Sequence, residues 1–165
     1  VGLDRGSGRS MRDVYVGGLG NVLDALPAGG RFVYVSSTSV YGQTDGGWVD
    51  ETSPTEPAEE AGRVVREAER LLRERRPDAI ILRLAGLYGP DRLLRKQPVL
   101  KGEPLVGDAD KWLNLVHVAD AADAVVAAAE RAAPGATYTV ADDTQTPRRA
   151  VYERLAELMR APPAA

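Results

Sequence analysis

A short apolar run that ends abruptly in hydroxyl side chains constrains the fold of this chain more than any other feature. Residues 32–35 (FVYV) follow a Gly-Gly break and are aromatic or β-branched, which predicts a buried strand of a parallel sheet. Residues 36–39 (SSTS) come next, followed by Val-Tyr-Gly. Ligands of open α/β sheets bind at the carboxyl ends of strands. The hydroxyls therefore either form a site or satisfy backbone groups in a turn.

The rest of the chain alternates between helical and strand patterns. Helical spacing of apolar residues predicts helices at 11–26, 59–75, 120–131 and 147–159. Ser10 is expected to cap the first helix, and Thr146 the last, with Pro147 at its first position. Further strands are predicted at 79–84, 113–118 and 136–140. Such alternation is typical of an α/β fold.

Composition excludes several classes of function. The chain of 165 residues has no cysteine and one histidine, which excludes disulfides, thiolate catalysis, and zinc sites built from cysteines or several histidines. A net charge of -3 with no densely basic segment argues against nucleic acid as a partner. With these counts of cysteine and histidine, we expect no metal site. No apolar run has the length of a membrane span, so the default expectation is a cytoplasmic protein.

Several blocks, in the same order, resemble the NAD-dependent epimerase/dehydratase family of the extended short-chain dehydrogenase/reductase superfamily. The blocks include residues 31–42 (RFVYVSSTSVYG), 83–90 (RLAGLYGP), 114–120 (NLVHVAD) and 138–140 (YTV). The resemblance implies the C-terminal portion of a Rossmann-like doubly wound parallel sheet that lacks its first βαβ units. Residues 1–165 would then form a partial NAD(P)-binding domain with a small substrate-side segment, about 86–118 and 136–165.

The resemblance also implies roles for individual residues. Ser37 would be the catalytic hydroxyl that orients a nucleotide sugar or a similar hydroxy or keto substrate. NAD or NADP would contact Ser36, Leu84, Ala85 and Leu87, and the substrate would contact Thr38, Tyr41, Gly86 and Asn114. Related proteins suggest a homodimer through the helices at 11–26 and 59–75.

The chain departs from the family where the chemistry is done. The family passes a proton through a Tyr, with a Lys four residues later, but alignment puts Ala61 and Val65 at these positions. No Tyr or Lys lies between Gly42 and Pro77. Two hypotheses follow. The first is an atypical NAD(P)-dependent oxidoreductase, impaired in a truncated chain, whose proton passes through Tyr41 or through water. The second is a non-catalytic NAD(P)-binding or sensing protein.

Glycine and histidine residues invite two further interpretations. Gly2, Gly6 and Gly8 do not reproduce the family's glycine-rich phosphate-binding turn, so we expect this chain alone to bind a dinucleotide poorly. Residues 17, 18 and 20 are glycines inside a predicted helix and are interpreted as packing positions. His117 is interpreted as a structural histidine rather than a catalytic base.

Overall fold

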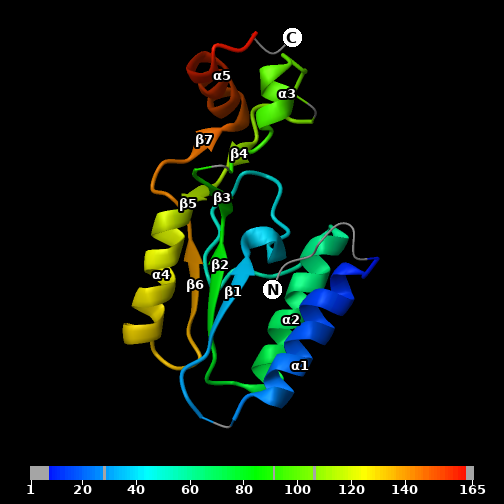
Figure 1. The fold of residues 1–165 in the computed structure, drawn as a ribbon, viewed down its shortest axis with the longest axis vertical. Helices are drawn as coiled ribbons and strands as arrows, with labels where there is room; N and C mark the ends of the chain where they lie inside the picture. The colour runs from blue at the N-terminus through cyan, green and yellow to red at the C-terminus, as the bar shows by residue number, and fades with distance from the viewer. Residues whose placement is uncertain (1–7, 28, 91, 106, 163–165) are drawn as a thin grey trace. The chain divides into compact units, whose positions relative to one another are not determined.

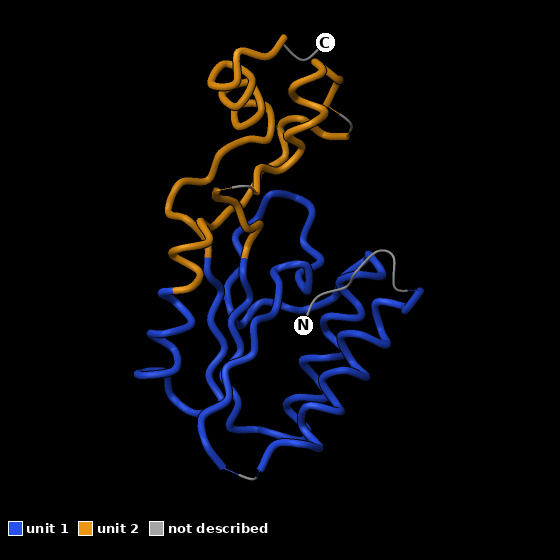
Figure 2. The backbone as a smooth tube through the Cα atoms, viewed as in Figure 1, with its two compact units in different colours: residues 1–84, 123–140 blue, residues 85–122, 141–165 orange. Residues whose placement is uncertain are grey.

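The computed structural model describes residues 8–27, 29–90, 92–105 and 107–162. The chain divides into two compact units, which Figure 2 distinguishes by colour. Unit 1 comprises Val1–Leu84 and Asp123–Val140, and unit 2 comprises Ala85–Ala122 and Ala141–Ala165. The boundary falls inside one helix, α4 (Val118–Arg131).

Unit 1 is built on a three-stranded parallel sheet in the order β1-β2-β6. The strands are β1 (Val33–Ser37), β2 (Ile80–Leu84) and β6 (Thr137–Val140). All five residues of the central strand β2 are buried, which is why its sequence, IILRL, reads as a continuous run rather than an alternation. The register places Ser37 beside Leu84, so β1 and β2 end together.

Two helices pack on one face of this sheet, and the end of α4 covers the other (Figure 1). The first begins with a π-helical turn, η1 (Asp13–Gly17), and continues as α1 (Gly18–Ala25). Ser10 caps it, because Ser10 Oγ accepts from Asp13 N and Asp13 Oδ2 accepts from Ser10 N, both at 3.1 Å. The second is α2 (Glu60–Arg75), preceded by a short 3₁₀ turn, η2 (Thr38–Val40). Their shared core contains Leu19, Leu23, Ala68, Leu72, Ala79 and Ile81.

The described residues of unit 2 form two small sheets, the helices α3 and α5, and the first residues of α4. Strands β3 (Gly86–Tyr88) and β5 (Leu115–His117) pair in parallel, and β4 (Trp112–Leu113) and β7 (Thr146–Pro147) pair antiparallel. Helices α3 (Lys96–Leu100) and α5 (Arg148–Met159) enclose a core of Val99, Tyr152 and Ala156.

The structure confirms the α/β class and corrects several details of the sequence prediction. Thr146 and Pro147 form strand β7, so α5 begins at Arg148 and has no side-chain cap. Helix α3 was not predicted, because its five residues include a proline and show no periodicity. Residues 137–140 were assigned to the substrate-side segment but pair with β2 in unit 1.

The three glycines of the first helix are not close-packing positions. A Cβ at Gly17 would have no neighbour within 4 Å, and at Gly18 and Gly20 the nearest atom would be 4.0 Å away. One glycine that packing does require is Gly62 in α2, where a Cβ would lie 2.2 Å from the carbonyl oxygen of Ser39.

Candidate functional site at the strand ends of unit 1

The two serines at the end of β1 face opposite sides of the sheet. Successive side chains of a strand alternate, so Ser36 shares with Tyr34 the face that packs under α1 and α2. Ser37 shares the other face with Val35, which is 49% exposed. Ser37 Oγ accepts from Ser39 N at 3.2 Å and so caps η2. Its hydroxyl hydrogen makes no hydrogen bond within the described residues, so the turn role leaves Ser37 able to donate to a ligand.

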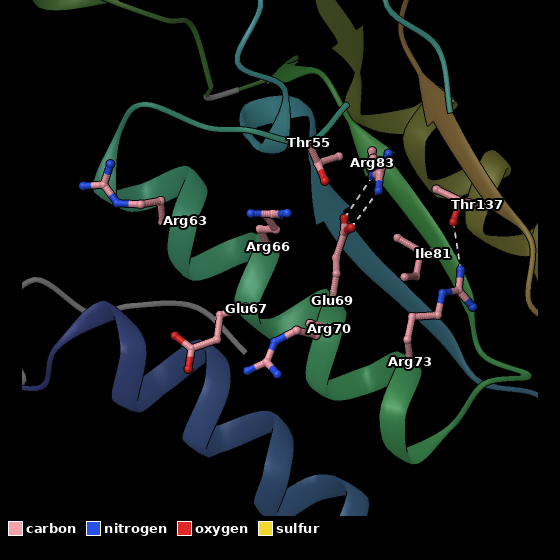
Figure 3. Close-up of a pocket in the computed structure, with 10 residues that line it drawn as sticks. All are labelled: Thr55, Arg63, Arg66, Glu67, Glu69, Arg70, Arg73, Ile81, Arg83 and Thr137. Atoms are coloured by element: carbon pink, nitrogen blue, oxygen red, sulfur yellow. Dashed lines mark hydrogen bonds and ion pairs between the residues drawn. The ribbon is translucent and has the colours of Figure 1, made fainter. Parts of the chain in front are cut away.

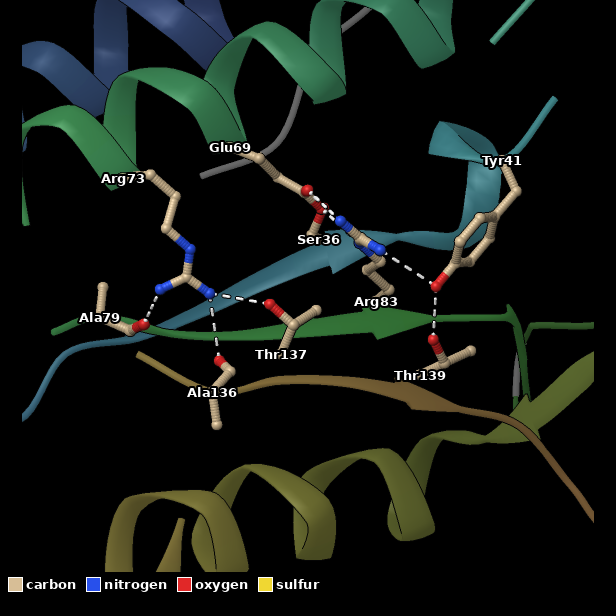
Figure 4. Close-up of polar contacts among 9 residues, drawn as sticks. All are labelled: Ser36, Tyr41, Glu69, Arg73, Ala79, Arg83, Ala136, Thr137 and Thr139. Atoms are coloured by element: carbon tan, nitrogen blue, oxygen red, sulfur yellow. Dashed lines mark hydrogen bonds and ion pairs between the residues drawn. The ribbon is translucent and has the colours of Figure 1, made fainter. Parts of the chain in front are cut away.

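Ser36 belongs to a buried ion-pair network between β1, β2 and α2 (Figure 4). Its hydroxyl donates to Glu69 Oε1 at 2.5 Å. The guanidinium of Arg83 donates two hydrogen bonds to the same carboxylate, from Nε to Oε1 at 3.1 Å and from Nη2 to Oε2 at 2.8 Å. The side chains of Glu69 and Arg83 are only 8% and 10% exposed. This bidentate pairing compensates two charges that burial would otherwise penalise strongly.

Tyr41 extends the same network toward β6 (Figure 4). Arg83 Nη1 donates to the phenol oxygen at 3.1 Å, and the guanidinium carbon lies 5.2 Å from the ring centroid. Because arginine only donates, the phenol hydrogen is directed to Thr139 Oγ1, 2.7 Å away. Burial alone lowers the pKa of Arg83, but hydrogen bonds to Glu69 and Tyr41 outweigh it, and the pKa is raised. Tyr41 is therefore firmly positioned by two partners.

The remaining predicted site residues lie at or just after the end of β2, in η2 and in unit 2. Leu84 and Ala85 are buried, at 6% and 5% exposure, so their side chains are not available to a ligand. Thr38 is half-buried at the start of η2.

Within unit 2, Gly86 N donates to the carbonyl of Asn114 at 3.1 Å. A Cβ at Gly86 would lie 3.0 Å from Leu115 Cδ2, so a side chain there would require Leu115 to shift. Leu87 is half-buried, and its carbonyl accepts from Arg92 Nε at 3.1 Å. Asn114 is exposed.

His117 has the contacts of a structural residue. Its Nδ1 accepts from Ala119 N at 3.2 Å, and its ring packs edge-on against Tyr88 with centroids 5.3 Å apart. A hydrogen bond with Asp142 raises the pKa of Tyr88. Among the described residues no group of three or more His, Asp or Glu side chains is arranged to hold a metal ion.

Helix α2 offers no substitute for the missing Tyr/Lys pair at the aligned positions. Ala61 is exposed and Val65 is buried, and neither side chain carries a proton. The family's Lys lies beside a phenol. Among the described cations of unit 1, which are arginines, Arg83 is the one that contacts a phenol, that of Tyr41.

Comparison with known proteins identifies the family. A family model described as the NAD dependent epimerase/dehydratase family matches residues 9–141. The chain belongs to this family. Solved structures of epimerase/dehydratase proteins are similar to the chain in fold.

The matched part of this epimerase/dehydratase chain spans only about half the length of the relatives described next. Protein YeeZ of Escherichia coli K12 is 35% identical over 130 residues, 78% of this chain but 46% of YeeZ. A conserved protein of unknown function from Silicibacter pomeroyi is 36% identical, with a TM-score of 0.74 over 88% of this chain and 52% of that one. The dTDP-glucose 4,6-dehydratase of Streptomyces venezuelae, solved with NAD bound, is 26% identical, with a TM-score of 0.74 over 87% and 48%.

Sequence reasoning missed the Glu69–Arg83 pair, although two signals pointed to it. Glu69 lies four residues after Val65 and three before Leu72, so it falls on the apolar stripe of α2. Arg83 is the one charged residue in the otherwise apolar β2. A buried charge without a partner is strongly destabilising. An acidic residue on a buried helix stripe and a basic residue in a buried strand are therefore expected to form an ion pair.

None of the helices in the described part of the chain combines the length and apolar character that crossing a bilayer would require.

Proposed function

We propose that the protein is an NAD(P)-dependent oxidoreductase of the epimerase/dehydratase type, acting on a nucleotide sugar or a similar hydroxy or keto substrate. The observation that carries the proposal is Ser37. It lies at the carboxyl end of β1, level with the end of β2, with a hydroxyl hydrogen that no described residue accepts. Family membership gives this position its expected partner, a substrate oxygen close to a nicotinamide.

The residues at these strand ends fit a dinucleotide through backbone rather than side chains. The Ser36 hydroxyl is committed to Glu69, and Leu84 and Ala85 are buried. We therefore assign the backbone of residues 84–87 to the nicotinamide and the hydroxyls of Ser37 and Thr38 to the substrate. Bound NAD(P) would supply the hydride acceptor or donor. Gly86 and Asn114 remain proposed substrate contacts.

Proton transfer needs a group other than the usual Tyr/Lys pair. In this proposal the proton passes through Tyr41 or through water. The Tyr41 hydroxyl is held between Arg83 and Thr139, in the network on the side of the sheet opposite Ser37, so a water would relay its proton to a substrate held by Ser37. The variant Tyr41→Phe keeps the ring and removes the hydroxyl, so it separates the two routes: loss of turnover without loss of cofactor binding assigns the proton to Tyr41.

The second candidate is an NAD(P)-binding or sensing protein without turnover. The exposed methyl of Ala61 and the buried isopropyl of Val65, at the aligned Tyr and Lys positions, favour it. Both candidates keep the strand-end site and differ only in chemistry.

A turnover assay distinguishes the candidates. The purified protein is incubated with reduced cofactor and a panel of nucleotide-linked keto sugars, and oxidation of the nicotinamide is followed. The oxidoreductase proposal predicts turnover that falls about 10²–10³-fold in Ser37→Ala, the range for losing one positioned hydrogen-bond donor to the reacting oxygen. Ser39→Ala, which removes a hydroxyl from the same turn, should behave as the unmodified protein. Binding without any turnover would favour the sensing role, and equal effects of both variants would refute the role of Ser37.

A homodimer through α1 and α2 also remains a proposal. Val22 and Leu26, at and just after the end of α1, are 37% and 43% exposed, which supports an apolar contact there. Sedimentation that stays monomeric across rising concentration would contradict it.

A further inference from the structure

A stripe of arginines runs along α2, away from the strand-end serines. Arg63, Arg66, Arg70 and Arg73 are spaced by three, four and three residues, which places them on one side of the helix. Together with residues that include Thr55 and Thr137 they line a cleft of about 550 Å³ (Figure 3). This volume lies within the range of sites that bind small molecules. All of these residues belong to unit 1.

Several charges around the cleft already cancel one another. Arg83 is paired with Glu69, and Glu67, which also lines the cleft, is paired with Arg12 at 2.5 Å. Arg70 forms an exposed ion pair with Glu74 at 2.9 Å. These residues add no net charge to the cleft.

The other three arginines have no carboxylate partner within the described ranges. Arg63 donates to the carbonyl oxygen of Ala58, and Arg66 makes no hydrogen bond or ion pair in the described part of the chain. Arg73 is half-buried and donates to carbonyl oxygens, such as that of Ala79 at 2.5 Å, and to Thr137 Oγ1 at 2.8 Å. The cleft therefore carries a local excess of positive charge in a protein whose net charge is -3.

This arrangement is unfavourable while the cleft holds only water. Like charges at neighbouring positions of a helix face destabilise the helix, and Arg63 and Arg66, three residues apart, form one such pair. Burial lowers the pKa of Arg73, which shows that its charged form is penalised where it lies. An anion between these side chains would relieve both penalties.

We propose that the cleft of Arg63, Arg66 and Arg73 binds a phosphate-bearing anion, either a free polyphosphate or the phosphate chain of a nucleotide. Arg63 and Arg66 keep hydrogens with which a guanidinium pairs with phosphate oxygens. The Nη hydrogens of Arg73 are donated to Pro77, Ala79, Ala136 and Thr137, so Arg73 contributes its charge rather than a bidentate contact. Thr137 Oγ1 accepts from Arg73 and keeps its hydrogen for a phosphate oxygen. Ser37 faces the other side of the sheet, so the site is independent of the function proposed above.

Isothermal titration of the purified protein with pyrophosphate and, separately, with ADP tests the proposal. One saturable site is expected, weakening as salt is raised. Arg66→Gln should weaken binding about tenfold, the effect of losing one charge-assisted hydrogen bond. Arg66 makes no described contact, so this variant should fold normally. Arg131→Gln is the matched control, because it removes the same charge from α4, on the opposite face of the sheet.

Each outcome of the titration decides the proposal. Tighter binding of ADP than of pyrophosphate identifies a nucleotide, and equal or tighter binding of pyrophosphate identifies a free polyphosphate. Absence of saturable binding, or equal weakening by Arg66→Gln and Arg131→Gln, would overturn the site. NADH binding is measured in parallel and should be unchanged in Arg66→Gln; an equal loss there would place the phosphate in the cofactor site instead.

Discussion

Replacing Glu69 with Gln leaves the guanidinium of Arg83 buried without its carboxylate. The side chain of Arg83 is 10% exposed, and both of its bonds to Glu69 are 3.1 Å or shorter. The amide of Gln cannot accept both donors, because one of its two ends is itself a donor. Removing one partner of a buried pair costs about 3–5 kcal/mol. This is a large part of the roughly 5–15 kcal/mol that holds a domain folded.

Urea unfolding at neutral pH, followed by circular dichroism, measures this loss. In a thermal scan the same loss should lower Tm by roughly 6–20 °C, at about 2–4 °C per kcal/mol for a chain of this size. The matched control is Glu74→Gln on the same helix, whose partner Arg70 is 68% exposed. Exposed pairs contribute about 0–1 kcal/mol, so the control should barely change stability.

A double variant separates pairing from packing. Glu69→Met combined with Arg83→Met removes both charges while keeping side-chain volume, and such replacements of buried pairs are often nearly neutral. The double variant should recover at least half of the loss, with the remainder due to the Ser36 and Tyr41 hydroxyls that lose partners. A Glu69→Gln effect no larger than that of Glu74→Gln would refute the reasoning.

Two further predictions concern packing and pH. Gly62→Ala should destabilise the protein by about 1–3 kcal/mol, since a Cβ there would lie 2.2 Å from the Ser39 carbonyl oxygen. Gly17→Ala, where a Cβ has no neighbour within 4 Å, should stabilise the protein by about 1 kcal/mol. Chemical denaturation compares the two variants, and equal changes in the free energy of unfolding would contradict the packing. Burial raises the pKa of Tyr34 to about 12, so stability that is complete below about pH 10 should fall as pH rises toward 12, because the unfolded state ionises first. Tyr34→Phe should flatten that alkaline decline, and an unchanged decline would show that another group causes it.

The sequence predicted those parts of the fold that depend on local pattern. Ser10 caps the first helix because its hydroxyl accepts from the backbone N–H of Asp13, while the Asp13 carboxylate accepts from the backbone N–H of Ser10. This arrangement needs no tertiary contact. The buried strands follow from runs of β-branched residues, with β1 extending two residues further than the apolar run because Ser36 and Ser37 also pair with β2.

Features that depend on distant partners were not predictable in this way. Thr146 has the sequence of a helix cap, but pairing with Leu113 draws it into β7. Ser36 was expected to contact the cofactor, yet the alternation of the strand turns its hydroxyl toward Glu69, whereas the Ser37 hydrogen makes no bond within the described residues. Gly62 gave no signal in sequence, since its close neighbour comes from a separate turn.

The measurement that tests the central claim most directly is the fluorescence of NADH and NADPH titrated with the purified protein. If the strand end of β1 receives a nicotinamide, one of the two cofactors should show a saturable change, at the weak affinity expected of this chain alone. Ser37→Ala should alter that response while changing stability by no more than about 1 kcal/mol, and Ser39→Ala should leave it intact. A protein that leaves both cofactors unaffected, or a Ser37→Ala variant that binds them as the unmodified protein does, would contradict the account.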